Sequence, residues 1–325
     1  MDKANTIVLY TTGGTISSVY DADSGTIIPE LTGEQLIEHI RPVLGDIDVE
    51  LNDMEIRPGP HMTPKFVLEL SKLIVEQLKR PEVSGAVVTQ GTDSVDEVSY
   101  LLNLLVKSEK PVVITGAMKS ENELYNDAIG NLTGAIRIAN DKKSMNKGVL
   151  VYFDETIQSA HDVEKYHANR VDAFVSPKGP LGGVYHGEII YNREPIEEPV
   201  YEPENLDQKV GLIKVCIGMD DLPVRVYMDN GYDGIVIEGF GAGNVPPTIA
   251  DAVVEAMKMG IIIILVSRCF DGEAIQVYDY KGGGAQLGRA GVISGGYLSG
   301  QKARLKLMVL LGSGLSRSEI RESFM

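Results

Sequence analysis

The fold class follows from one stretch near the start of the chain, Thr6-Ile7-Val8-Leu9-Tyr10-Thr11-Thr12-Gly13-Gly14-Thr15. Its apolar first half predicts a buried strand of a parallel sheet. The glycine pair that follows allows a tight turn and the close approach of a ligand to the backbone. Ligands of open α/β sheets bind at the carboxyl ends of strands, so this loop is a candidate binding site. A plain strand-to-helix turn capped by threonine or serine explains this stretch alone equally well.

Composition indicates a globular chain of about two domains. The chain has 325 residues, of which 43% are hydrophobic, and this length exceeds one ordinary hydrophobic core. The net charge of −16 repels the phosphates of nucleic acids, and the sequence contains no basic patch that would offset it. We therefore expect neither DNA nor RNA as a partner.

The sequence contains no predicted membrane span or secretion signal, so we expect a cytoplasmic protein. The most apolar run, residues 261–266, is far too short to cross a bilayer. The first residues lead into a strand without an apolar signal region. Cys216 and Cys269 lie in apolar runs and predict buried thiols, and the five histidines lack metal-ligand spacing. We therefore expect no structural metal.

Strands and helices alternate in the first part of the chain. Strands are predicted at residues 47–56, 85–89, 111–115 and 149–153, and helices at 32–40, 63–78, 94–106 and 127–140. Ser94 and Glu97 predict a capping box, and the second helix has a predicted buried stripe of Phe66, Leu70, Leu73, Ile74 and Leu78. This alternation predicts a mostly parallel sheet flanked by helices, with flavodoxin-like winding.

The pattern changes in the second half. Residues 173–191 predict short β segments and a hairpin that includes Gly182-Gly183. Residues 193–209 are rich in proline and acidic side chains and predict a linker. Strands at 210–215, 234–237 and 261–266 then predict a smaller C-terminal α/β domain. The predicted division is thus 1–192 for the larger α/β domain, 193–209 for the linker and 210–325 for the smaller domain.

Two predicted strands end in the same chemistry. Gly13-Gly14-Thr15 follows the first strand and Gly91-Thr92-Asp93 follows the strand at residues 85–89. At one edge of one sheet, two threonine hydroxyls and a carboxylate would converge on a single cleft. A threonine hydroxyl with a proton acceptor and nearby backbone N–H groups suits acyl transfer from an amide. Helix capping alone remains an alternative.

These motifs resemble those of the bacterial-type L-asparaginase and glutaminase family, and the similarity extends over nearly the whole chain. The first motif is Thr12-Gly13-Gly14-Thr15-Ile16, and the second is Gln90-Gly91-Thr92-Asp93-Ser94, with Ser94 where threonine is usual. Further similar blocks lie at residues 110–118, 131–132, 146–151, 220–223, 231–236 and 301–304. The resemblance implies a two-domain α/β hydrolase without a metal or cofactor, usually a homotetramer built of intimate dimers.

The resemblance also implies roles for individual residues. Thr15 would be the nucleophile, Thr92 the second catalytic threonine, Lys165 the lysine that polarises it, and Asp93 the carboxylate that binds the substrate's ammonium. Asn244 matches a position that reaches into the neighbouring subunit's site. Without the resemblance, Lys165 would be interpreted as an ordinary surface lysine.

Two departures concern activation and substrate binding. The tyrosine that usually follows the nucleophile is replaced by Ile27-Ile28-Pro29, which leaves Tyr20 and Tyr280 as candidates for activating Thr15. Tyr278 and Tyr280 fall where a residue of the partner subunit is often seen.

The loop that usually binds the substrate carboxylate through a serine and an amide has Gly59-Pro60 instead, between Arg57 and His61. Losing two polar partners is expected to weaken asparagine binding by about 100-fold or more, and Arg57 or His61 could supply a charge for a different acid.

The expected function is hydrolysis of the side-chain amide of L-asparagine to aspartate and ammonia through Thr15. A related amidase acting on glutamine, D-asparagine or a modified amide is one alternative. A non-catalytic amino-acid-binding homologue is another. The glutaminase subunit of a tRNA-dependent amidotransferase is disfavoured, because that protein normally carries an extra N-terminal domain. We expect a homodimer or homotetramer with sites near the subunit interface.

Overall fold

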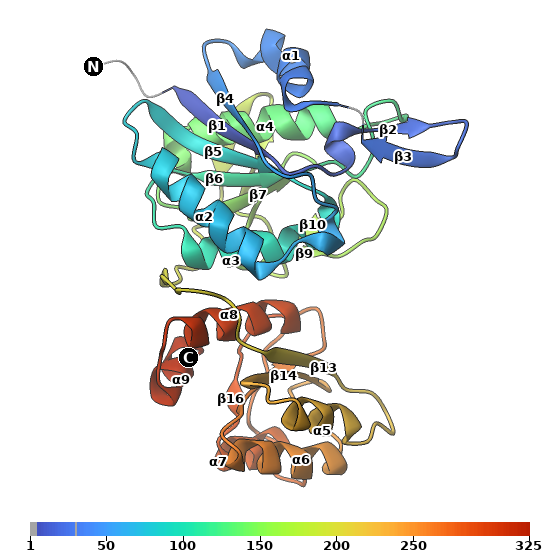
Figure 1. The fold of residues 1–325 in the computed structure, drawn as a ribbon, viewed down its shortest axis with the longest axis vertical. Coiled ribbons are helices and arrows are strands. Elements are labelled where there is room, and N and C mark those ends of the chain that lie inside the picture. Colours follow the sequence, from blue (N-terminus) through green and yellow to red (C-terminus); the bar gives the residue numbers. More distant parts are fainter. Residues whose placement is uncertain (1–4, 30) are drawn as a thin grey trace. The chain divides into compact units, whose positions relative to one another are not determined.

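A computed structural model describes residues 5–29 and 31–325 and divides the chain after Val200 into two compact α/β units (Figure 1). The predicted linker, residues 193–209, spans this division. The two-domain α/β class predicted from the sequence is confirmed, with a larger N-terminal unit and a smaller C-terminal unit.

The N-terminal unit is built on one large sheet in the order β12-β11-β8-β7-β6-β5-β1-β4. The five strands from β7 to β4 are parallel, and β8, β11 and β12 extend the sheet antiparallel. The strand bounds are β1 Thr6–Thr11, β4 Asp48–Asp53, β5 Val83–Thr89, β6 Val112–Thr115, β7 Val149–Phe153, β8 Thr156–Ser159, β11 Gly182–Tyr185 and β12 Glu188–Tyr191.

The order of the parallel strands confirms the flavodoxin-like winding. The chain places β4 on one side of β1 and β5 on the other, so the strand order reverses at β1. The crevice at the carboxyl ends of strands flanking such a reversal is where open α/β sheets bind ligands. The loops that follow β1 and β5 therefore lie at this position.

Helices cover both faces of the sheet (Figure 1). Alternate residues of β1 face opposite sides of the sheet, and Ile7 and Leu9 belong to the core formed with α1 and α4. Helices α2 and α3 pack against each other outside this core. The helix bounds are α1 Gly33–Leu44, α2 Pro64–Leu78, α3 Val95–Leu105 and α4 Ala128–Asn140. Thr32 and Thr63 cap α1 and α2 with their hydroxyls, as the sequence predicts.

Two local predictions in these helices are wrong. Leu73 is 42% exposed, because it lies at the edge of the buried α2 stripe formed at four-residue spacing by Phe66, Leu70, Ile74 and Leu78. Ser94 makes no side-chain cap to α3. Its Oγ instead donates to the carbonyl oxygen of Gly59 at 2.9 Å, so a contact between two loops replaces the predicted capping box.

Two short antiparallel ribbons stand apart from the large sheet. β2 Ser18–Asp21 pairs with β3 Thr26–Pro29, and β9 Glu164–Lys165 pairs with β10 Phe174–Val175. The predicted hairpin is present as β11 and β12, with Gly182 and Gly183 inside β11 rather than in its turn.

The C-terminal unit has a four-stranded parallel sheet in the order β13-β14-β15-β16. Helices α5 and α6 build a core on this sheet, and α8 also packs against its strands. The bounds are β13 Val210–Lys214, β14 Gly234–Gly239, β15 Ile262–Ser267, β16 Ile293–Ser294, α5 Leu222–Asp229, α6 Pro247–Lys258, α7 Gly284–Ala290, α8 Gly300–Gly312 and α9 Arg317–Ser323.

The prediction of buried thiols is wrong. Cys216 and Cys269 are exposed free cysteines, because the apolar strands β13 and β15 end before them and they fall in the loops that follow. Within the described residues, no helix is long and apolar enough to cross a membrane.

Candidate active site

Three loops of the N-terminal unit meet at the carboxyl ends of β4, β1 and β5. Gly13 and Gly14 follow β1 with φ angles of 98° and 96°, a region that L-residues with side chains rarely adopt. A Cβ atom on Gly14 would lie 2.4 Å from the backbone nitrogen of Gly91, and one on Gly91 would lie 3.0 Å from the backbone nitrogen of Gly59. Backbone of all three loops is therefore in close contact, so a side chain is excluded at Gly14 and would crowd the neighbouring backbone at Gly91.

Thr15 begins the short 3₁₀ turn Thr15–Ser17 directly after this contact and is half-buried. The hydroxyls of Ser17 and Ser18 both donate to the carbonyl oxygen of Gly14, at 3.1 and 2.9 Å, and the backbone N–H of Ser17 donates to it as well. The serines thus hold the turn, whereas the hydroxyl of Thr15 has no hydrogen-bond partner within residues 5–29 and 31–325. Of the hydroxyls in this loop, that of Thr15 remains available to a substrate.

Thr92 opens a second 3₁₀ turn, Thr92–Ser94, at the end of β5. Its side chain is buried, and its Oγ1 accepts a hydrogen bond of 2.9 Å from Nζ of Lys165. The same Nζ donates to Oδ1 of Asp93 at 2.8 Å. Lys165 thus joins a threonine and a carboxylate that lie more than 70 residues before it in the chain. The sequence alone does not distinguish Lys165 from an ordinary surface lysine.

The two ends of this ion pair differ in exposure. The side chain of Lys165 is 14% exposed and that of Asp93 is 64% exposed. The ammonium is therefore largely withdrawn from water, whereas the carboxylate of Asp93 is open to a cationic group of a ligand. Helix α3 begins directly after this turn, so the positive end of its dipole favours an anionic group nearby.

The loop after β4 forms the third part of the site through the 3₁₀ turn Gly59–His61. Gly59 is buried, and a Cβ atom placed on it would lie 3.1 Å from Cβ of Asp93 and 3.3 Å from its backbone nitrogen. Pro60 is exposed beside it. The loop that lacks the usual serine therefore lies directly against the backbone and Cβ of Asp93, the candidate ammonium-binding residue.

The two charged candidates of this loop lie in different environments. The guanidinium of Arg57 pairs with Glu55 and stacks 4.8 Å from the ring centre of Phe66, on helix α2. His61 is exposed at the end of the 3₁₀ turn. Arg57 is thus already held by an anion and an aromatic ring, which leaves His61 as the less restrained of the two.

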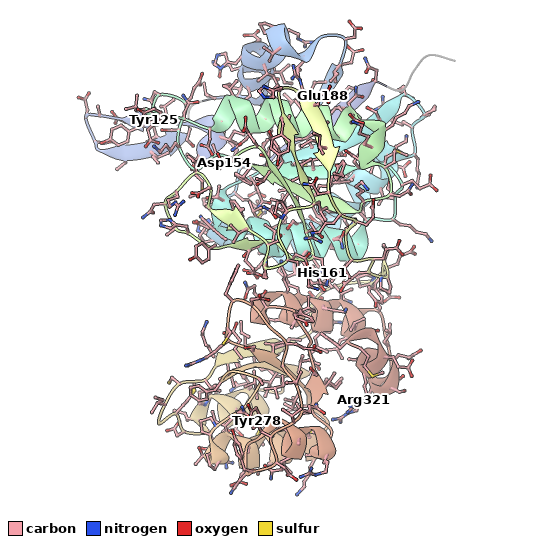
Figure 2. All side chains as sticks on the ribbon, turned by 180° about the vertical axis from the view of Figure 1, so that it is seen from behind. Tyr125, Asp154, His161, Glu188, Tyr278 and Arg321 are labelled. Carbon is pink, nitrogen blue, oxygen red and sulfur yellow. The ribbon has the colours of Figure 1, made fainter. Side chains whose placement is uncertain are left out.

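The candidate activating tyrosines lie in different units. Tyr20 is on β2, is 41% exposed, and has its hydroxyl 4.0 Å from the position of a Cβ on Gly25, in the turn of its own hairpin. Tyr280 lies in the C-terminal unit and is 53% exposed. The same unit contains Tyr278, which is labelled in Figure 2. It also contains the half-buried Asn244, whose Oδ1 accepts a hydrogen bond from the backbone N–H of Gly284.

Comparisons with protein-family models identify the family of the chain. The model described as "Asparaginase, N-terminal" matches residues 6–197, and that described as "Glutaminase/Asparaginase C-terminal domain" matches residues 209–324. The chain belongs to the asparaginase family. This asparaginase-family chain is therefore a hydrolase that acts on linear amides.

Relatives of this asparaginase-family enzyme match it over nearly their full length. An L-asparaginase of Bacillus licheniformis is 31% identical, covering 94% of this chain and 95% of the relative. A probable L-asparaginase of Deinococcus radiodurans is 34% identical, with coverages of 98% and 96%. The crystal structure of a probable cytoplasmic L-asparaginase from Campylobacter jejuni superposes with a TM-score of 0.88 at 29% identity, covering 98% of each chain.

Two buried carboxylates near the site were not predicted from the sequence. Asp96 and Asp162 are buried carboxylates on the two segments that carry Thr92 and Lys165. Asp162 stands three residues before Lys165, and Asp96 lies in the first turn of α3. Charged residues on a loop and at a helix start are common on protein surfaces, so only their burial in the fold distinguishes them. Within the described residues, no group of three or more His, Cys, Asp or Glu side chains could hold a metal ion.

Proposed function

We propose that this enzyme hydrolyses the side-chain amide of L-asparagine to aspartate and ammonia, with Thr15 as the nucleophile. The observation that carries the proposal is the contact of Lys165 Nζ with both Thr92 Oγ1 and Asp93 Oδ1, at 2.9 and 2.8 Å, beside the loop of Thr15 in an asparaginase-family chain. The relatives named as L-asparaginases support the choice of substrate.

In the proposed mechanism, Asp93 binds the substrate's α-ammonium and Thr15 Oγ1 attacks the amide carbon. The hydroxyl proton of Thr15 passes to the departing nitrogen, which leaves as ammonia, and water then hydrolyses the acyl-enzyme ester to release aspartate and restore the threonine. Lys165 orients Thr92, whose hydroxyl proton is directed away from the ammonium because its oxygen accepts from Lys165. Thr92 is thereby placed to relay protons to the reacting groups.

Oligomer formation and location belong to the same proposal. We propose a homodimer or homotetramer in which Asn244 and Tyr280 of one subunit complete the site of another. We also propose a cytoplasmic location, which the similarity to the probable cytoplasmic L-asparaginase of Campylobacter jejuni supports. We also propose the domain division predicted from the sequence, with a linker at residues 193–209.

A second candidate is an amidase for a different amino-acid amide. The observation that favours it is the close packing of Gly59 against Asp93, which leaves no side chain at the position where a serine usually binds the substrate carboxylate. The substrate in that case would carry its acid where His61 can reach it, as in glutamine, D-asparagine or a modified amide.

The test is ammonia release by the purified enzyme from L-asparagine, L-glutamine, D-asparagine and side-chain-modified amides, with Thr15→Ala as the control. We expect the highest kcat/KM for L-asparagine and loss of activity in Thr15→Ala. A higher kcat/KM for another amide supports the second candidate, and wild-type rates in Thr15→Ala would refute Thr15 as the nucleophile.

A further inference from the structure

Lys165 is the one proposed catalytic side chain of the N-terminal unit whose strand lies outside the large sheet. It stands on β9, a two-residue strand that forms a two-stranded sheet with the two-residue β10. Thr15 and Thr92, by contrast, directly follow the long parallel strands β1 and β5. A ribbon of this size is not stable by itself, so other contacts must fix the position of Lys165.

One such contact joins the backbone of Lys165 to helix α3. The backbone N–H of Lys165 donates to Oδ2 of Asp96 at 3.4 Å. Asp96 is buried, with 7% of the residue exposed, and follows Thr92 on the same segment of chain. The lysine is therefore attached at its backbone to the segment that carries its side-chain partner.

A second set of contacts fixes the chain just before Lys165. Oδ2 of Asp162 pairs with Nη2 of Arg193 at 2.8 Å, and Oδ1 pairs with Nδ1 of His161 at 2.7 Å. Nη2 of Arg193 also donates to the carbonyl oxygen of Gly179 at 2.6 Å. The backbone N–H of Asp162 donates to the carbonyl oxygen of Ser159, at the end of β8. Asp162 thus ties the segment of Lys165 both to the large sheet and to residue 193.

Burial and charge make this tie strong. The side chain of Asp162 is 5% exposed and that of Arg193 is 25% exposed. Burial raises the pKa of Asp162, but its bonds to His161 and Arg193 outweigh this effect and hold the pKa at about 2. His161, which precedes Asp162 in the sequence, is labelled in Figure 2 and lies at one end of the N-terminal unit. Removing one partner from a buried, charge-assisted pair is costly because the other partner keeps its charge.

We propose that Asp162 is a positioning residue for the reaction: through its pair with Arg193, and together with the Asp96 contact, it holds Lys165 within hydrogen-bond distance of Thr92. The proposal rests on the proposed function, in which Lys165 acts on Thr92. A displacement of about 1 Å at a catalytic group lowers the rate by about 100-fold. Loss of the tie therefore lowers kcat without removing any group that touches the substrate.

The experiment compares Asp162→Asn with the matched control Glu194→Gln. Glu194 follows Arg193 directly in the sequence, and its exposed side chain pairs with Lys147 at 2.6 Å rather than with Asp162. We expect Asp162→Asn to lower kcat for the best substrate by about 10- to 100-fold with KM within about threefold, and Glu194→Gln to retain wild-type values. Circular dichroism establishes that each variant is folded. If Asp162→Asn fails to fold, Arg193→Lys replaces it, with an expected fall of about fivefold to tenfold.

A double-mutant cycle separates positioning from a general structural effect. In the background of Lys165→Met, Asp162→Asn should change the residual kcat by less than about twofold, because the residue it positions is already lost. Asp96→Asn keeps an oxygen acceptor and should retain more activity than Asp96→Ala. Wild-type kcat in Asp162→Asn, an equal fall in Glu194→Gln, or full additivity with Lys165→Met would overturn the inference. If Lys165→Met itself retains wild-type kcat, the proposed function is at fault instead.

Discussion

Gly14 and Gly91 touch through their backbones so closely that a Cβ atom on Gly14 would lie 2.4 Å from the nitrogen of Gly91. The contact brings together the two loops that carry Thr15 and Thr92. Because both partners are backbone atoms of short loops that follow β1 and β5, neither can move aside without disturbing the end of its strand. The distance between the two threonines is thus set by main-chain packing.

Gly14→Ala should therefore damage both stability and activity. The added methyl group meets the Gly91 backbone, and the alanine must also adopt a φ of 96°. We expect a loss of about 2–4 kcal/mol in the free energy of unfolding and a fall in kcat/KM of about 100-fold or more. Gly45→Ala is the matched control, because Gly45 has a φ of 64° but nothing within 4 Å of its Cβ position. An equal effect on activity in both variants would contradict the explanation by packing.

Lys165→Met should lower kcat by about 100-fold or more, because Thr92 loses its charged hydrogen-bond donor and Asp93 its cation. Thr92→Val should produce a fall of similar size, and the double variant should lose little more, as expected for groups that act as one unit. Lys79→Met is the control, since its pair with Glu76 lies on the surface. Steady-state ammonia release measures all four, and additive losses would show that the two residues act independently.

Gly59→Ser should not restore a conventional carboxylate-binding loop. Its Cβ would lie 3.1 Å from Cβ and 3.3 Å from the nitrogen of Asp93, so Asp93 must shift by a few tenths of an ångström. We expect KM for L-asparagine to rise by about threefold to tenfold, because the proposed ammonium partner moves. A lower KM in Gly59→Ser would show instead that the loop accommodates the serine and that the usual subsite can be rebuilt.

Ser94→Ala removes the hydroxyl that donates to the carbonyl oxygen of Gly59 at 2.9 Å. The expected loss is about 1 kcal/mol in the free energy of unfolding, typical of one hydrogen bond, with KM raised because the Gly59 loop is less restrained. Ser94→Thr keeps the hydroxyl and is expected to match the wild type. Urea denaturation and KM measured on both variants provide the check. Equal stabilities of the alanine and threonine variants would rule out a role for the hydroxyl.

His161 should make stability fall as pH rises above neutrality. Burial lowers the pKa of His161, but hydrogen bonds to Asp162 and Glu198 outweigh it, and the net shift is upward from 6.5. The charged imidazole therefore stabilises the fold fully below pH 6.5, and this contribution disappears as pH rises through the higher folded-state pKa. In His161→Gln, the decline of the free energy of unfolding from pH 6 to pH 9 should be smaller than in the wild type. Parallel profiles would contradict this assignment.

The sequence predicts the sheet and the motif loops well because their causes are local. An apolar run followed by Gly13 and Gly14 constrains a strand and its turn within ten residues, and the same holds for the strand that ends at Gly91. The flavodoxin-like winding then follows from the alternation of strands and helices, and the observed strand order confirms it.

Features that depend on distant contacts were not predictable in this way. The hydroxyl of Ser94 fits a local capping rule, but a carbonyl oxygen 35 residues away competes for it. Lys165 meets Thr92 across 73 residues, on a ribbon too short to give a periodic signal. The exposure of Cys216 and Cys269 depends on where two apolar strands end, and element boundaries are the least certain part of a sequence pattern.

The pairing of β1 with β5 has a consequence for how activity is gained during refolding. Thr12 and Thr89, which are hydrogen-bonded at the ends of these strands, are 77 residues apart in the chain. Helices can form early from neighbouring residues, but pairing β1 with β5 brings together distant parts of the chain and carries the entropy cost of that closure. A partly folded chain rich in helix would consequently lack the arrangement of Thr15 and Thr92 altogether. Recovery of ammonia release is thus a stringent reporter of native strand order, and it should lag behind recovery of the helical circular dichroism signal.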